Sequence, residues 1–125
     1  MNPKFYQCDT CKNLVHLIDE GGGTLVCCGN DMKELIANTV EASVEKHLPA
    51  VSFEDTTLMV DVGSVAHPMV PEHFISFIYV QTQKGGQLHR LEIGSEPSAR
   101  FAFIDDKPVA VYAYCNIHGM WKTEL

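Results

Sequence analysis

The sequence has no run of basic residues and little positive charge, with 9 lysines and arginines against 16 aspartates and glutamates. The resulting net charge of -7 argues against a surface for nucleic acid. No apolar stretch is long enough to span a bilayer, and residues 1–6 lack the apolar core of a signal peptide. We therefore expect a cytoplasmic protein that binds neither nucleic acid nor membranes.

Internal repeats and long amphipathic helices are absent as well, and the chain from residue 50 onward consists of short apolar runs between turn residues. Apolar residues alternate cleanly in 58–62, whereas 74–80 is almost continuously apolar, which suits a strand buried on both faces. Further strands are expected at 88–93, 99–103 and 109–114, with turns at 84–86, 94–97 and 105–108. The pattern predicts a mainly β protein built on an immunoglobulin-like antiparallel β-sandwich.

Residues 1–36 are expected to form a separate small domain. Strand candidates at 5–7 and 24–26 each run into a pair of cysteines, and the glycines at 21–23 supply the turn between them. A piece below ~40 residues rarely folds on a hydrophobic core alone, so a metal or a dimer contact must hold it. The second domain is expected to cover 37–125, and it begins with a connector whose helical turn Pro49 stops.

Four of the five cysteines lie in the first domain. In a reducing cytoplasm, clustered cysteines bind metal more often than they form disulfides. Cys8 and Cys11 are spaced for chelation, but Cys27 and Cys28 are adjacent, with Cα atoms ~3.8 Å apart. Their sulfurs must splay to reach one metal, which distorts the tetrahedron. Such a site suits iron or zinc alike, and a purely structural role for it stays open.

The fifth cysteine belongs to a second group of metal-binding side chains. Cys115 and His118 form a Cys-x-x-His pair, which cannot close a metal site without further ligands. Prolines stiffen the segment that carries two histidines upstream, and a third stands in the connector; together these upstream histidines are His47, His67 and His73. Four imidazoles and one thiolate exceed what zinc or copper normally take from a protein, and they leave octahedral iron one open position for chemistry.

His16 and His89 have no liganding neighbour in sequence, so we expect them to be ordinary core or surface residues.

These motifs resemble a known family. The cysteine pairs 8/11 and 27/28 are similar to those of the desulforedoxin module. A second set of motifs resembles the superoxide reductase domain, namely Glu45-Lys46-His47, His67-Pro68-Met69, His73 and Cys115-x-x-His118-Gly-x-Trp121. In this order they resemble the desulfoferrodoxins, over nearly the whole chain. The resemblance implies an Fe(Cys)4 centre at Cys8, Cys11, Cys27 and Cys28. It also implies a second iron with Cys115 axial and four equatorial histidines, His47, His67, His73 and His118.

The function implied by the resemblance is superoxide reductase: one-electron reduction of superoxide to hydrogen peroxide at non-haem iron. The family also implies a homodimer and an electron donor such as rubredoxin. Lys46 is placed beside His47 to attract the anion, and a unit charge ~4 Å away contributes on the order of 4 kcal/mol near a protein surface. The carboxylate of Glu45 is implied to occupy the open position of oxidised iron. Elsewhere on a surface, such a charged pair would be of little consequence.

Two other functions stay open on the sequence alone. Cys115-x-x-His118-x-Met120 with one upstream histidine resembles the ligand loop of a blue-copper electron-transfer protein. That hypothesis leaves two histidines, Lys46 and the four cysteines unexplained. The other is a zinc-stabilised binding module without catalysis. Metal analysis and a visible spectrum distinguish both from an iron enzyme.

Overall fold

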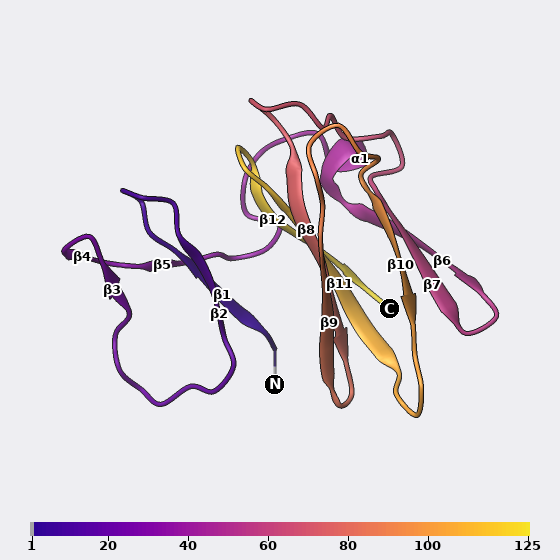
Figure 1. The fold of residues 1–125 in the computed structure, drawn as a ribbon, viewed down its shortest axis with the longest axis horizontal. Coiled ribbons are helices and arrows are strands. Elements are labelled where there is room, and N and C mark those ends of the chain that lie inside the picture. Colours follow the sequence, from indigo (N-terminus) through magenta and orange to yellow (C-terminus); the bar gives the residue numbers. More distant parts are fainter. Residues whose placement is uncertain (1) are drawn as a thin grey trace. The chain divides into compact units, whose positions relative to one another are not determined.

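The computed structural model describes residues 2–125 and divides the chain into two compact units, with the boundary between Ile36 and Ala37 (Figure 1). Both units consist mainly of short strands, and the second is a sandwich of two antiparallel sheets. The predicted fold class is therefore confirmed. None of the helices among residues 2–125 is long and apolar enough to cross a membrane.

The first unit is built on a small antiparallel sheet. β1 (Lys4–Gln7) is central, between β2 (Leu14–Leu17) and β5 (Lys33–Glu34), and β3 (Val26–Cys27) pairs with β4 (Asn30–Asp31) in a separate hairpin. The predicted strand at 5–7 matches β1, and the one at 24–26 overlaps β3 only at Val26. β2, β4 and β5 were not predicted, because strands of two to four residues are too short to show alternation.

Two facing sheets make up the second unit, as Figure 1 shows, with the single helical turn α1 (Val44–His47) at one end. One sheet has the order β10-β7-β6 and the other the order β12-β11-β8-β9. Their strands are β6 (Pro49–Glu54), β7 (Thr57–Val62), β8 (Ile75–Thr82), β9 (Gly85–Arg90), β10 (Ser98–Ala102), β11 (Pro108–Cys115) and β12 (Gly119–Glu124).

The core of the second unit lies between these sheets. Buried apolar side chains from both sheets form one cluster, which contains Leu58, Val60, Val62, Met69, Ile75, Ile78, Val80, Phe101, Val111, Ala113 and Cys115. The alternation read in 58–62 places its apolar residues in this core. β8 is buried on both faces, as its continuous apolar run predicted.

Two details of the strand prediction were wrong. The strand expected at 88–93 is β9, which begins three residues earlier, because the turn is at 83–84 and Gly85 already pairs with Thr82. Gly86 lies within the strand and under the ring of Tyr79, and a Cβ at that position would overlap the ring. β12 was not predicted, since its residues follow directly on the Cys-x-x-His motif.

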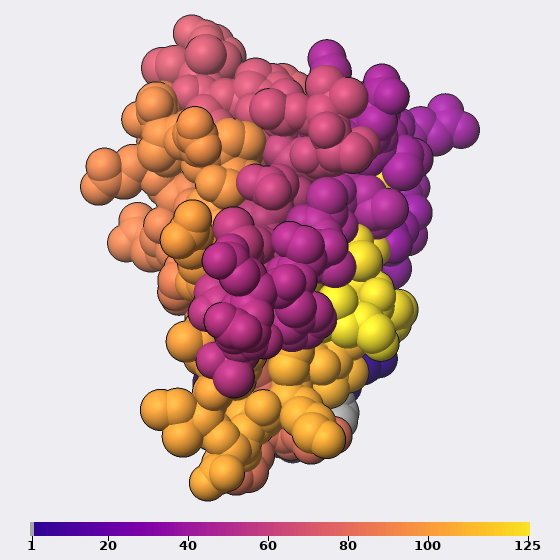
Figure 2. All heavy atoms as spheres, turned by 90° about the vertical axis from the view of Figure 1, so that its right-hand side faces the viewer, coloured from indigo at the N-terminus to yellow at the C-terminus, as the bar shows by residue number. Residues whose placement is uncertain are grey.

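The connector into α1 is fastened to the edge strand β12. Asn38 has a left-handed φ of 61°. Its backbone N–H donates to the carbonyl of Met120 at 2.9 Å, and its side-chain amide exchanges two hydrogen bonds with the backbone of Lys122, at 3.1 and 2.9 Å. Thr123 of β12 also donates to the carbonyl of Pro49 at 2.7 Å. Figure 2 accordingly shows the C-terminal residues (yellow) beside the chain that follows α1.

Candidate metal centres

The four cysteines of the first unit converge on one point. Cys8 and Cys11 come from the turn after β1, whereas Cys27 ends β3 and Cys28 follows it. All four sulfurs lie within 4.8 Å of one another. The Sγ of Cys27 is 3.6 Å from that of Cys11 and 4.0 Å from that of Cys28. Sulfurs of a tetrahedral site with metal–sulfur bonds of about 2.3 Å are about 3.8 Å apart, so the group fits a four-thiolate metal site.

Backbone conformation explains how adjacent cysteines reach the same metal. Cys28 has a φ of 52°, in the left-handed region that few non-glycine residues adopt, and Gly29 follows with a φ of 78°. This turn directs the sulfurs of Cys27 and Cys28 to the same side. On the opposite loop the N–H of Cys11 donates to the Sγ of Cys8 at 3.5 Å. The splay expected from the sequence is thus achieved by a local backbone turn.

Two thiols of this group, those of Cys8 and Cys27, have pKa values shifted in opposite directions. The N–H of Cys11 lowers the pKa of Cys8 to about 6. The neighbouring thiols of Cys11 and Cys8 raise the pKa of Cys27 to about 12. Close thiolates oppose each other's ionisation, and a bound cation removes that opposition. The acidity pattern therefore agrees with a metal site.

The second group lies at one end of the sandwich, where α1, the connection from β7 to β8 and the turn from β11 to β12 meet. His47 ends α1, His67 and His73 lie on the connection, Cys115 ends β11, and His118 is the last residue of the turn. The ligand atoms of His47, His67, His73 and Cys115 lie within 4.8 Å of one another. His118 adjoins this group, with its Nδ1 3.0 Å from the Nε2 of His47 and 3.9 Å from the Sγ of Cys115.

The four imidazoles are arranged as a square. Going round it, neighbouring ring centroids are 4.5 to 5.1 Å apart and the rings are nearly perpendicular, at 74° to 88°, in the order His47, His67, His73, His118. The diagonal from His47 to His73 is longer, at 6.1 Å, and its rings are closer to parallel, at 33°. Four rings in this order suit four equatorial ligands around one ion.

Hydrogen bonds on the outer nitrogens determine which nitrogen of each ring faces inward. The Nδ1 of His47 is 2.6 Å from the carbonyl of Ser43, and that of His67 is 2.7 Å from the carbonyl of Pro68. A carbonyl only accepts, so each Nδ1 carries the proton and each Nε2 presents a lone pair.

These two lone pairs face each other at 3.2 Å with no proton between them. Adjacent ligands at right angles around an ion with metal–nitrogen bonds of about 2.1 Å are about 3.0 Å apart. The buried Nε2 of His73 likewise has no hydrogen-bond partner. The donor set thus fits a cation at the centre of the square.

Burial keeps the imidazoles ready to bind metal. His47 and His67 are each 2% exposed. Burial lowers the pKa of His67 to about 4, and it also lowers the pKa of His47 and of His73. A lowered pKa favours the neutral imidazole, which is the form that binds metal. Burial raises the pKa of the Cys115 thiol, whereas the N–H groups of His118 and Ile117 lower it.

The charged pair in front of this site is exposed to solvent. Glu45 and Lys46 belong to the same helical turn as His47. The positive charge of Lys46 is close enough to contribute, after burial, to lowering the pKa of both His47 and His73. Lys46 is thus near the imidazole square while it stays accessible to small anions.

Behind the square, Trp121 supports two of its members. Its indole stacks on the ring of His47, with centroids 5.0 Å apart, and its N–H donates to the carbonyl of His118 at 3.2 Å. His16 and His89 belong to neither metal-binding group among residues 2–125. They stack instead on Phe5 and Phe101, with centroids 4.5 and 4.2 Å apart.

Comparison with known proteins decides the family. The desulfoferrodoxin model matches residues 39–124, and the model of the desulfoferrodoxin N-terminal domain matches residues 2–35. The chain belongs to the desulfoferrodoxin family. It is 42% identical over 119 residues to a desulfoferrodoxin of Syntrophotalea carbinolica, covering 95% of this chain and 94% of the relative. The two metal sites fit the two iron centres of this family.

Superoxide reductases are among the related proteins. One from Pyrococcus horikoshii is 36% identical over 99 residues, covering 65% of this chain and 86% of the relative. A superoxide reductase structure from Treponema pallidum superimposes with a TM-score of 0.83 and 34% identity, covering 99% of this chain and 100% of that one. The likeness therefore includes both units.

Some parts of the site could not be found by motif. The carbonyls of Ser43 and Pro68 belong to no recognisable pattern. Neither does the turn at Gly63 and Ser64, which contacts the backbone of Glu45 in α1. Gly63 stands between two valine-containing runs like any loop glycine, and no signal in the sequence distinguishes it.

Proposed function

We propose that this protein is a superoxide reductase, which adds one electron and two protons to superoxide and releases hydrogen peroxide. The observation that carries the proposal is the square of four imidazoles beside a buried thiol. Bound there with the five groups as ligands, iron supplies the electron and one open coordination position. Family membership and the likeness to superoxide reductases support the same activity. A blue-copper site, by contrast, uses two histidines rather than four.

The protein's own residues give this centre its selectivity. We propose that His47, His67, His73, His118 and Cys115 would hold the iron. The two Nδ1–H bonds to backbone carbonyls hold the imidazoles of His47 and His67 in orientation.

Lys46 attracts the anion against a net charge of -7, which salt screens beyond ~8 Å. Glu45, on the same turn, is proposed from the family resemblance as the carboxylate that would bind the metal.

Further partners belong to the same proposal. Superoxide reduction produces no oxygen, so each turnover consumes an electron from outside, and we propose a rubredoxin-like donor. A homodimer is proposed on the family resemblance, and sedimentation at several concentrations tests it. Thiolate ligands must stay reduced to hold iron, and we therefore propose a cytoplasmic location. The first centre has four protein ligands and hence no open position, which supports a role other than catalysis.

The sharpest test of the proposal is Lys46→Met. The variant should react with superoxide at least about tenfold more slowly, roughly 1.4 kcal/mol in the barrier, with a weaker dependence on ionic strength. Iron content and the resting spectrum should stay unchanged, because lysine is not a ligand. Pulse radiolysis at several salt concentrations measures the rate of the reaction with superoxide and its dependence on ionic strength.

Two further variants serve as controls. Lys84→Met makes the same change in net charge at the opposite end of β8 from the site, in an exposed turn, and should keep the rate. Glu45→Ala removes a negative charge, so capture should be as fast or faster, while the spectrum of oxidised iron should change. An unmodified rate and salt slope in Lys46→Met would contradict the proposed capture.

A further inference from the structure

The helical turn that carries the charged pair is too short to hold itself. α1 has four residues, and Ser43 at its N-cap makes no side-chain hydrogen bond to it. A helix of this length is unstable without outside support, since nucleation costs more than one turn returns. Yet α1 presents Glu45, Lys46 and His47 to the site. Its geometry must therefore be fixed by neighbouring elements.

The sequence itself removes one support from α1. In a continuing helix the carbonyl of Glu45 would accept a hydrogen bond from the backbone N–H four residues later. Residue 49 is a proline and has no N–H to donate. The carbonyl oxygen of Glu45 consequently needs a donor from another part of the chain.

The turn after β7 supplies two donors to this oxygen. The N–H of Val65 donates to the Glu45 carbonyl at 2.9 Å, and the hydroxyl of Ser64 donates to it at 3.2 Å. Gly63, which is buried, permits the approach: a Cβ there would lie 2.5 Å from the Glu45 oxygen and 2.9 Å from the Leu48 oxygen. Both of these are backbone atoms, so a side chain at 63 would force α1 to move.

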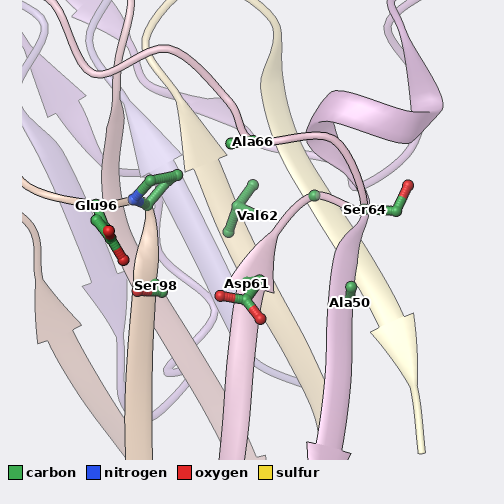
Figure 3. Close-up of a pocket in the computed structure, with 9 residues that line it drawn as sticks. Ala50, Asp61, Val62, Ser64, Ala66, Glu96 and Ser98 are labelled. Carbon is green, nitrogen blue, oxygen red and sulfur yellow. The ribbon is translucent and has the colours of Figure 1, made fainter.

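The same turn is anchored on its other side to the core and to the metal site. Val62 is fully buried, and its N–H donates to the carbonyl of Pro97, just before β10, at 2.8 Å. The N–H of His67 donates to the Val62 carbonyl at 2.9 Å. A pocket of about 460 Å³ beside this turn is lined by Asp61, Glu96 and Ser64 among others. Figure 3 shows the side chain of Ser64 directed away from Asp61 and Glu96.

We propose that the turn formed by Gly63, Ser64 and Val65 is a positioning element of the reaction. It replaces the donor that Pro49 lacks, fixes the backbone of Glu45, and so sets the direction in which the side chains of Glu45 and Lys46 project. The inference rests on the proposed function, in which these two residues act at the open side of the iron. The observed contacts of the three turn residues with α1 are to backbone oxygens, so we infer that they act through α1.

Ser64→Ala tests the proposal with the least disturbance. Loss of one of the two donors to Glu45 should slow the reaction with superoxide by about three- to tenfold. Ser64→Thr keeps the hydroxyl and should restore the rate. Ser95→Ala is a matched control: it also removes an exposed serine hydroxyl that donates to a backbone carbonyl, but that carbonyl belongs to Glu92, at 2.6 Å, and not to α1, so the variant should keep the rate.

A double-mutant cycle separates positioning from general damage. If Ser64 acts through Lys46, Ser64→Ala should have no further effect on the rate in the Lys46→Met background. Equal slowing in both backgrounds, or no slowing in either, would overturn the proposal.

Gly63→Ala gives a readout that does not depend on the reaction. The added methyl group must displace α1, so the amide of Val65, which donates to Glu45, should exchange its hydrogen at least about tenfold faster than in the unmodified protein. The exchange of β8 amides should stay unchanged, which confirms that the sandwich is intact. Unchanged exchange at Val65 would overturn the inference. If Lys46→Met itself kept the full rate, the proposed capture would fail, whereas the exchange result would still decide whether the turn holds α1.

Discussion

Within residues 2–36 only Phe5 and Cys8 are buried, whereas residues 37–125 enclose a continuous apolar cluster between two sheets. The two metal sites reflect this difference. In the first unit the ligands hold together a piece that is too small for a core of its own. In the second unit the core comes first, and Cys115, which is fully buried, belongs to both the core and the metal site.

Metal and fold are related differently in the two units: in the first the metal stabilises the fold, and in the second the fold supports the metal site. Four thiolates close the first centre and stabilise the unit around it, so that metal and fold depend on each other. The second centre lies at the ends of strands and beside a short helix, which the apolar core and hydrogen bonds within the protein hold in place. Because its geometry does not depend on filling every coordination position, it can leave one open for chemistry.

Metal removal should give the largest difference between the units. In zinc-finger peptides a structural zinc contributes about 10–16 kcal/mol, and the first unit has too small a core to fold without a comparable contribution. After chelation under reducing conditions, amides of β1 and β2 should lose protection from hydrogen exchange, while those of β8 and β11 keep most of theirs. Protection retained in β1 without metal would show that the first unit has a sufficient core, and the comparison would fail.

Cys11→Ser directs the same test at the first centre alone. Cys11 is an exposed member of the four-cysteine site, so its loss should release that metal without changing the second unit. With an artificial donor, superoxide reduction should continue, because the first centre has no open position. Cys115→Ser is the reciprocal variant: it should abolish the reaction and keep the spectrum of the first centre. An intact second iron without single-turnover reduction in Cys11→Ser would make the first centre an obligatory relay.

Phe101→Ala tests the claim that the second unit depends on its core. Phe101 is 1% exposed, and truncation of a buried phenylalanine costs about 3–5 kcal/mol. Chemical denaturation followed by circular dichroism should show this loss in the second unit, with the spectrum of the first centre unchanged. Phe53→Ala is the matched control, because Phe53 is 56% exposed and its truncation should cost under about 0.5 kcal/mol.

The sequence predicted the chemistry of the sites better than the lengths of the strands. Cysteine and histidine spacing is visible directly in the chain, and the apolar alternation of 58–62 was sufficient to place β7. Two-residue strands such as β3 and β4 carry no periodicity, and their pairing follows from the turn at Cys28 and Gly29. Local sequence patterns were therefore sufficient to predict a residue's role where the residue type alone determines that role, as for the metal-binding cysteines and histidines.

The features that could not be predicted depend on contacts between segments that are far apart in the sequence. Pro49 was correctly interpreted as the end of a helical turn, but the consequence for the Glu45 carbonyl depends on a turn 18 or more residues away. The order of the four imidazoles around the square also follows from the sandwich, since they come from a helix and two different loops. No spacing rule in a single sequence contains this information.

The smallest expected effect concerns the link between core and metal in the second unit. Trp121→Phe keeps an aromatic ring that can stack on His47 but removes the N–H donor to the His118 carbonyl, and a lost hydrogen bond of this kind costs about 1–2 kcal/mol. Chelator competition should show slightly faster loss of iron from the second centre only. Trp121→Leu removes the stack as well and should lose iron faster still. Iron retention equal to that of the unmodified protein in both variants would mean that the strands alone hold these two histidines, and that Trp121 is an ordinary core residue.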